Sequence, residues 1–471
     1  MQPRHDIRSG ITWPNFRSLL WAAMMTFSAT ATTGQTRVEF DQYRLDNGLT
    51  VILHEDHSAP VASVVAMYHV GSKNEKPGRT GFAHLFEHMM FQGSQHVSDD
   101  GHFKLLQEIG ANINGTTSND RTNYFETVPS NYLELALYLE SDRMGFLLPA
   151  MTQAKLDNQR DVVKNERRQS YDNQPYGTAG EKIDRVLYGE GHPYGWPVIG
   201  YMEDLSAALL DDVKEFFKLY YAPNNAVLVV SGDIDRKQTQ EWIQKYFGSL
   251  PRGSEIERPE TRIVPPLTEE KRATFEDNVQ LPRLYLAWPS TPMHTRDDAV
   301  MDVLTDILSN GKNSRLYKSL VYEKQIAQSV VAYQNGLEIA GDAVIQVTAK
   351  PGKTLTEMET AVTEELERLL KDGVTEKEVQ TALNAKESQL INRQSTSFGK
   401  GNALATFYTL TGDAENFNRE SERFQGISSA EVLSVARKYL TENKVVLSVV
   451  PKGKKELAAE QRKLKARENK E

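Results

Sequence analysis

The sequence predicts an α+β fold made of two homologous domains, each a mostly antiparallel sheet covered by helices. Two observations carry this prediction. β-rich runs and helix-periodic segments follow one another in the same order in both halves of the chain. A helix end, a polar turn containing Asn and an apolar strand also recur about 219 residues apart, in 219–232 and in 437–450. A repeat at that separation indicates duplicated domains rather than a solenoid, whose repeats run about 20–50 residues.

The composition limits the classes of protein that are possible. The 471 residues are 39% hydrophobic and 25% charged, which is ordinary for a globular chain able to bury a large core. The absence of cysteine excludes disulfide scaffolds, cysteine-ligated metals and thiol catalysis. A net charge of −9 argues against nucleic acid as a partner, because phosphates require a basic surface.

The N-terminal segment predicts an export signal over residues 1–31. Three arginines precede the apolar stretch 18–31, which ends in Ala29-Thr30-Ala31. This stretch is too short to span a membrane, and no other part of the sequence approaches about 20 apolar residues. An amphipathic transit sequence is the alternative, but an uninterrupted apolar block favours a secretory signal. We therefore expect a secreted, periplasmic protein without a stable membrane span.

The first domain is predicted over 36–248. Asp46-Asn47-Gly48 splits the β-rich segment 37–56 and predicts a hairpin, and the apolar run 61–72 predicts a central strand. Helical periodicity follows, and then another apolar strand. The predicted helices cover 80–92, 102–109, 131–147, 153–171 and 205–220, and the strand covers 226–234.

The second domain is predicted over 269–452. A linker at 249–268, with four prolines and many charges, precedes it, and a highly charged tail at 453–471 follows it. Within the domain we expect a central strand at 283–290. The predicted helices cover 297–311, 355–371, 376–391 and 429–440.

One short segment carries chemistry, His84-x-x-Glu87-His88 within residues 78–94. Side chains at i and i+4 of a helix lie on one face, so both imidazoles can reach a single Zn²⁺ at about 2.0–2.1 Å. Glu87 shares that face and can accept a proton from water activated by the metal. The alternative is a polar helix face with histidines by chance. The apolar flanks argue against it, because buried polar groups need a partner.

A catalytic zinc needs a third protein ligand and an open fourth position. No further histidine fits a motif, which leaves carboxylates. The predicted helix 153–171 offers Asp157, Asp161 and Glu166, and composition does not choose among them.

The sequence around the motif resembles the pitrilysin/insulysin family of zinc peptidases, which includes the mitochondrial processing peptidase. The resemblance rests on the motif segment, on 112–129 and 160–170 in that order, and on HPYGWPVIG at 192–200. It implies His84, His88 and Glu166 as zinc ligands and Glu87 as the general base. It also implies an edge strand at Asn114, Gly115 and Thr116 that pairs with the backbone of a peptide substrate. Without the family context, Asn114-Gly115 is as readily a hairpin turn.

Three features depart from the family pattern. Gln159 replaces a second glutamate seven residues before the distal ligand. Val321 and Gln328 stand where active single-chain members carry an Arg and a Tyr that hold the substrate. In the second half, 302–308 replaces the metal motif with DVLTDIL.

The sequence thus predicts a zinc-dependent endopeptidase that hydrolyses peptides or unfolded polypeptide segments. The missing Arg–Tyr pair indicates a catalytic subunit completed by a homologous partner subunit that carries the pair, or a homodimer. The alternative is a non-hydrolytic assembly or binding subunit of the same fold. A nucleotide-binding enzyme is excluded, because neither G-x-x-x-x-G-K-[ST] nor G-x-G-x-x-G occurs.

Overall fold

The computed structural model describes residues 37–258 and 267–460. The predicted signal segment, part of the predicted linker and most of the charged tail lie outside these residues. No helix in the described ranges is both long and apolar enough to cross a bilayer.

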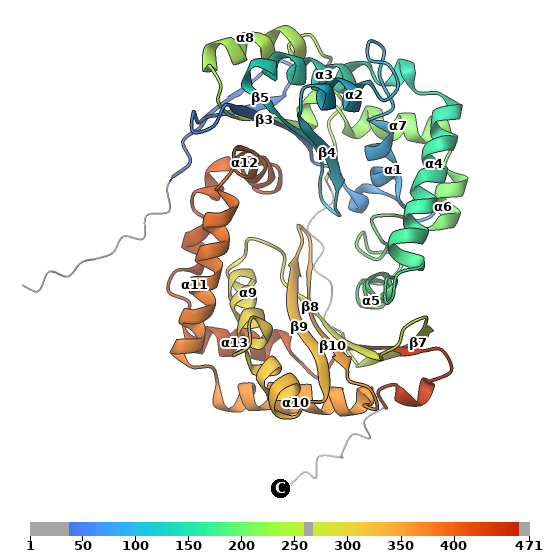
Figure 1. The fold of residues 1–471 in the computed structure, drawn as a ribbon, viewed down its shortest axis with the longest axis vertical. Coiled ribbons are helices and arrows are strands. Elements are labelled where there is room, and N and C mark those ends of the chain that lie inside the picture. Colours follow the sequence, from blue (N-terminus) through green and yellow to red (C-terminus); the bar gives the residue numbers. More distant parts are fainter. Residues whose placement is uncertain (1–36, 259–266, 461–471) are drawn as a thin grey trace, which may run out of the picture. The chain divides into compact units, whose positions relative to one another are not determined.

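The described strands form two sheets with the same arrangement (Figure 1). Sheet A has the order β1 (Asp41–Arg44), β2 (Thr50–Glu55), β6 (Ala226–Gly232), β3 (Val61–Tyr68), β5 (Thr122–Pro129) and β4 (Asn112–Thr117). Sheet B has the order β7 (Lys271–Asp277), β11 (Val445–Pro451), β8 (Arg283–Ser290), β10 (Gly341–Ala349) and β9 (Ala327–Gly336). Neighbours are antiparallel except β2–β6 and β7–β11. The predicted α+β class with two mostly antiparallel sheets is therefore confirmed.

The repeat found in the sequence corresponds to a repeat in structure. The last five strands of sheet A follow the same order and directions as the five strands of sheet B. The repeated segments 219–232 and 437–450 each contain the end of a helix followed by a central strand. These are α7 and β6 in the first half, and α13 and β11 in the second. The predicted hairpin is also present, since β1 pairs with β2 with Arg44 opposite Thr50.

The helices cover the faces of these sheets. The first half contains α1 (Phe82–Met89), α2 (Gly101–Glu108), α3 (Leu133–Phe146), α4 (Gln153–Arg167), α5 (Ala179–Tyr188), α6 (Met202–Ala207), α7 (Leu210–Tyr220) and α8 (Arg236–Phe247). The second half contains α9 (Arg296–Ser309), α10 (Leu355–Asp372), α11 (Glu376–Arg393), α12 (Ser397–Thr411) and α13 (Ser429–Tyr439). Helices α5, α8 and α12 were not predicted.

The single helix predicted at 205–220 is wrong, because the structure has two helices there. Ala208 and Leu209 adopt extended backbone between α6 and α7. Arg160 donates to the carbonyl of Ala208, at the end of α6, at 3.0 Å. The side chain of Asp212 accepts a hydrogen bond from the backbone N–H of Leu209 at 3.4 Å and begins α7. The apolar residues repeat at helical spacing across 205–220, but these local hydrogen bonds end one helix and begin another within that segment.

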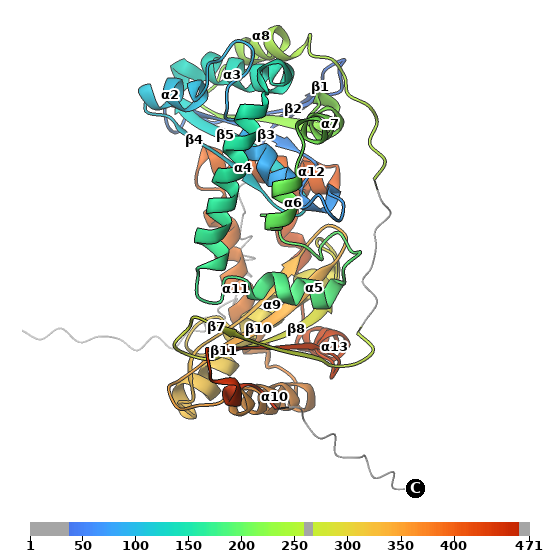
Figure 2. The same cartoon turned by 90° about the vertical axis from the view of Figure 1, so that its right-hand side faces the viewer.

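Each sheet receives one helix from the other half of the chain. On sheet A, α3 and α8 lie on one face, and Leu404 and Phe407 of α12 pack on the other with Ile52 and Val229 (Figure 1). On sheet B, α5 packs on the face opposite the main apolar core of that half (Figure 2). The two halves thus share their hydrophobic cores.

Candidate metal centre

Helix α1 carries the His-x-x-Glu-His motif, and a buried acid fixes where the helix begins. The carboxylate of Glu75 accepts hydrogen bonds from the backbone N–H groups of Gly81 at 2.9 Å and Ala83 at 2.8 Å. These are donors that the first turn of a helix leaves unpaired. Burial raises the pKa of Glu75, and the hydrogen bonds from Ala83 and Gly81 oppose that shift. Gly81 has φ 84°, and a Cβ there would lie 2.8 Å from the Cα of Gly200. The sequence does not signal this role of Glu75, because the residue lies seven positions before the first residue of α1, outside the cap and first-turn positions that mark a helix start.

Helix α4 supplies the third group of the cluster. The Nε2 atom of His88 lies 3.2 Å from Oε2 of Glu166, and Nε2 of His84 lies 3.8 Å from Oε1. The ligand atoms that the three side chains offer all lie within 4.8 Å of one another. Two atoms bound to one tetrahedral Zn²⁺ are about 3.3 Å apart, given metal–ligand bonds of about 2.0–2.1 Å. The donor set and its spacing therefore fit zinc.

The choice left open among three acids of α4 has a geometric answer. Glu166 faces the two histidines, on the same helix face as the buried residues Gln159 and Val163. Asp157 and Asp161 are exposed and pair with Arg160 and Lys164 of their own helix. Gln159, only 6% exposed, lies two turns before Glu166, at the position where the family pattern has a second glutamate.

The electrostatics of the cluster favour the protonation states that bind a metal. Burial, assisted by the neighbouring His88, lowers the pKa of His84 to about 4 and keeps its imidazole neutral. The hydrogen bond with His88 lowers the pKa of Glu166, which keeps its carboxylate ionised. Neutral imidazole and ionised carboxylate are the forms that coordinate zinc.

Glu87 lies on the same helix but has a different partner. Its Oε2 accepts a hydrogen bond of 2.6 Å from Oγ1 of Thr117, at the end of β4. Burial raises the pKa of Glu87, and the bond from Thr117 opposes that shift. The carboxylate is therefore held beside the cluster of His84, His88 and Glu166 and is not itself one of the clustered donors.

Strand β4 carries the predicted substrate-binding residues at the edge of sheet A. Asn114, Gly115 and Thr116 all lie inside the strand, so the hairpin-turn interpretation is wrong. A Cβ on Gly115 would approach Glu87 Oε1 to 3.2 Å, so a side chain there would crowd the acid. Thr116 faces the other way, and its hydroxyl donates to Asn123. β4 has one sheet neighbour, β5, which leaves its other edge unpaired among the described strands.

The two positions that depart from the family in the second half serve packing and surface. Val321 lies in a π-helical turn and packs against the core of sheet B. Gln328 is exposed on the edge strand β9. Neither supplies a guanidinium or a phenol.

Comparisons with known proteins agree with this fold. The sequence profile described as "Insulinase (Peptidase family M16)" matches residues 50–188, and "Peptidase M16 inactive domain" matches residues 208–386. The zinc protease PqqE of Helicobacter pylori is 29% identical over 401 residues, which are 84% of this chain and 89% of that protein.

Solved structures show the same similarity. A protease from Helicobacter pylori has a TM-score of 0.82 and 26% identity, over 88% of this chain and 100% of that one. The periplasmic protease PqqL from Escherichia coli shares the fold, with a TM-score of 0.72 and 18% identity, over 87% of this chain and 47% of that one.

The two similar sheets and the helix that carries His-x-x-Glu-His are the features of a two-domain peptidase fold. The protein belongs to the M16 family, the pitrilysin/insulysin family of zinc peptidases.

Proposed function

We propose that this protein is a zinc-dependent endopeptidase that hydrolyses peptides or unfolded polypeptide segments. The observation that carries the proposal is the cluster of His84, His88 and Glu166, with Glu87 held separately beside an open edge strand. His84, His88 and Glu166 would hold Zn²⁺. When bound, zinc supplies Lewis-acid activation of water and of the scissile carbonyl.

Glu87 would act as the general base. Its carboxylate would take a proton from the attacking water and pass it to the leaving amine. Thr117 supports this role, because its hydroxyl donates to Oε2 and leaves Oε1 for the water. Burial of Glu87 raises its pKa, and a base of raised pKa binds the transferred proton more firmly.

Substrate would bind as an added strand on β4. The unpaired edge offers backbone donors and acceptors to any extended chain, whatever its side chains. The end of β4 carries Thr117, so a peptide paired with this strand would pass next to Glu87. Folded proteins lack a free extended segment, which favours peptides and unfolded segments as substrates.

The chain would work as the catalytic subunit of a two-chain assembly. Val321 and Gln328 supply no Arg–Tyr pair, and a homologous partner subunit that carries the pair would complete the site. A homodimer is the alternative. A second candidate function, a non-hydrolytic assembly subunit, is favoured only by this missing pair. The clustered metal donors argue against it.

The site of action would be outside the cytoplasm. The apolar segment 18–31 after a basic lead supports export, and the Escherichia coli relative is described as periplasmic. Fractionation of cells that make the full chain tests this proposal. Recovery of the protein in the cytoplasmic fraction at its full length would contradict it.

The decisive experiment measures cleavage of denatured casein together with metal content. We expect zinc at about one ion per chain, bound through the three ligands of a catalytic site, and a loss of hydrolysis of about 10²–10⁴-fold in Glu87→Gln, with zinc retained. If Glu87→Gln cleaves at the parent rate, Glu87 is not the base. If the parent binds zinc but cleaves only after the partner subunit is added, the two-chain proposal is supported.

A further inference from the structure

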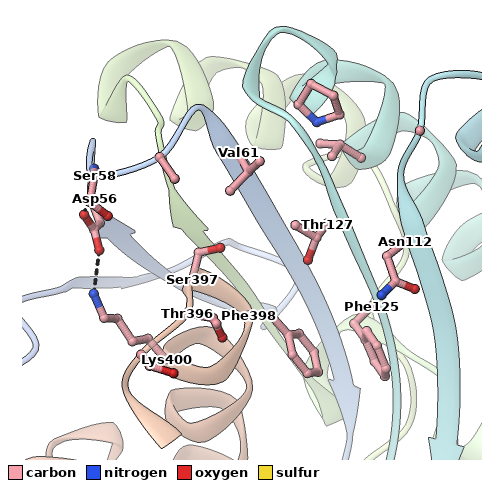
Figure 3. Close-up of a pocket in the computed structure, with 15 residues that line it drawn as sticks. Asp56, Ser58, Val61, Asn112, Phe125, Thr127, Thr396, Ser397, Phe398 and Lys400 are labelled. Carbon is pink, nitrogen blue, oxygen red and sulfur yellow. Dashed lines mark hydrogen bonds and ion pairs between the residues drawn. The ribbon is translucent and has the colours of Figure 1, made fainter. Parts of the chain in front are cut away.

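A cavity of about 610 Å³ lies on the face of sheet A that α12 covers, away from the metal centre (Figure 3). Its walls come from the ends of β3, β4 and β5, from the loop before β3, and from the start of α12. The apolar part of the wall consists of the side chains of Ala59, Val61, Phe125, Pro129 and Phe398. Phe125 and Phe398 are half-buried and pack against each other with ring centroids 4.4 Å apart.

Polar groups at the α12 end of the cavity are already paired. Lys400 forms an ion pair with Asp56, whose other oxygen accepts from the backbone N–H of Ser58 at 3.0 Å. Ser63 links the hydroxyls of Thr127 at 2.8 Å and Ser397 at 3.0 Å. Paired polar groups have little to gain from a charged ligand, so the half-exposed apolar wall is the part left to bind one.

The cavity is continuous with the open edge of sheet A. Asn112 begins β4 and also lines the cavity, and in Figure 3 its side chain lies at the opposite end from Lys400. Side chains directly opposite each other in paired antiparallel strands lie on the same face of the sheet. A peptide residue paired with Asn112 would therefore direct its side chain toward this cavity.

The distance along the strand places this residue relative to the cleaved bond. Asn112 and Thr117 are the two ends of β4, five positions apart. At about 3.3–3.4 Å per residue, this separation is about 17 Å. Thr117 contacts Glu87, so the residue over the cavity lies about four to six positions from the bond next to Glu87.

We propose that this cavity, the distal pocket, is a specificity subsite that receives a large apolar side chain of the bound peptide, about four to six residues from the cleaved bond. The inference rests on the proposed peptidase function and adds a substrate class to it. Substrates would be extended segments of at least about five residues on one side of the cleaved bond, with an aromatic or large aliphatic residue at the distal position.

The test uses the full chain and fluorescent peptides of about twelve residues with one cleavable bond. Phe or Ser is placed in turn at each of the positions about four to six residues away, on either side. We expect Phe to raise kcat/KM over Ser by about tenfold at one position, the discrimination typical of an apolar pocket.

Matched variants assign this preference to the cavity. Ala59 is an exposed residue of the wall, and Ala59→Trp should fill the cavity and reduce the Phe-to-Ser ratio to about one. Ser58→Trp, from the same loop, serves as the second variant if the first does not fold. Ala154→Trp places the same side chain on the exposed start of α4, outside the cavity, and should keep the parent ratio.

A binding measurement separates this inference from the proposed function. The affinity of Glu87→Gln for the same peptides, by fluorescence anisotropy, should show the same Phe-to-Ser ratio. If no peptide is cleaved, with or without the partner subunit, but the affinity ratio holds, the proposed function fails and the distal pocket stands. If peptides are cleaved and the ratio is one at all tested positions, or if filling the cavity leaves the ratio unchanged, the distal pocket is ruled out.

Discussion

Helices α1 and α9 follow the equivalent central strands β3 and β8 in the two halves, and they carry different side chains at matching positions. Where α1 has His84, Glu87 and His88, α9 has Asp302, Thr305 and Asp306 at the same spacing. Each of these helices packs against a second helix, α4 in the first half and α11 in the second.

A side chain of the second helix completes each cluster, a carboxylate in the first half and an ammonium in the second. In the first half, Glu166 of α4 contacts two imidazoles. In the second half, Nζ of Lys386 on α11 lies 3.8 Å from Asp302 and 3.4 Å from Asp306. Two imidazoles and a carboxylate have room for a cation between them, whereas two carboxylates and an ammonium already contain one. In both halves, two side chains of one helix meet a third from a second helix. The chemistry of these three side chains decides whether the cluster suits a metal ion or is already neutralised.

The largest expected effect is on zinc binding by the cluster in the first half. Glu166→Gln should lower zinc affinity by about a hundredfold or more, because a neutral amide is a poor zinc ligand. Lys386→Met should leave it unchanged. Competition with a chromophoric chelator measures both affinities. Equal zinc affinity in Glu166→Gln and the parent would remove Glu166 from the ligand set.

The next effect breaks the charge pairing of the second half. Lys386→Met leaves Asp302 and Asp306 without their cation, and we expect the free energy of unfolding to fall by about 3 kcal/mol. Lys377→Met, at an exposed position of the same helix, should change it by less than about 0.5 kcal/mol. Urea unfolding measures both variants. Equal effects of the two substitutions would show that Lys386 does not neutralise the acids.

The equivalent strands β5 and β10 each carry a buried acid, Glu126 and Asp342, and the two acids differ in their hydrogen bonds. Within the described part of the chain, neither carboxylate oxygen of Glu126 has a hydrogen-bond partner, and burial raises its pKa to about 8. Asp342 accepts hydrogen bonds from Tyr188 and Asn335, both at 3.0 Å. Burial raises the pKa of Asp342 less far, to about 6, because these bonds stabilise the ionised form.

These shifts predict that stability falls as pH rises. Each of these carboxyls has a pKa near 4 in the unfolded chain and a higher pKa in the folded one. Between the two values the folded state holds a proton that the unfolded state has lost. The free energy of unfolding therefore falls with each unit of pH until the folded pKa is passed. Urea unfolding should show that the free energy of unfolding of the parent chain is lower at pH 8 than at pH 5. Glu126→Gln should remove a part of this difference on the order of 2 kcal/mol, and Asp342→Asn a smaller part. A parent chain equally stable at both pH values would contradict this prediction.

The smallest effect concerns the hydrogen bond that Glu87 has and Thr305 cannot reproduce. Thr117→Val removes the donor to Oε2 and should lower kcat by about tenfold with little change in KM, while zinc content stays the same. Thr117→Ser should restore most of kcat. Thr305→Val, at the equivalent position of Glu87 in the second half, should have no effect on either constant. Loss of zinc in Thr117→Val would indicate a structural role instead.

Local sequence patterns were sufficient to predict the site's residue types and most long helices. The spacing of His84 and His88 predicts one helix face, and α1 has it. The three acids of α4 could not be separated by composition, because only packing of α4 against α1 decides that Glu166 faces the histidines. The resemblance supplied Glu166, and the geometry agrees with it.

Contacts between segments far apart in the chain could not be predicted. The pairing of Lys386 with Asp302 and Asp306 joins α11 to α9, and neither helix alone signals it. The hydrogen bond from Thr117 to Glu87 depends on where β4 lies against α1. Helix α12 was missed because it has no clear apolar stripe along one face, and its partner strands lie in the other half. Helix α5 was missed although Ala179, Ile183 and Leu187 repeat at helical spacing.

The placement of α5 and α12 makes each half incomplete by itself. A chain cut between the halves would yield two fragments, each with a bare apolar sheet face and a helix whose partner is on the other fragment. Neither fragment would fold as an independent module, and the intact chain would melt in a single transition. The two halves therefore form one cooperative unit, in which damage to either half unfolds both.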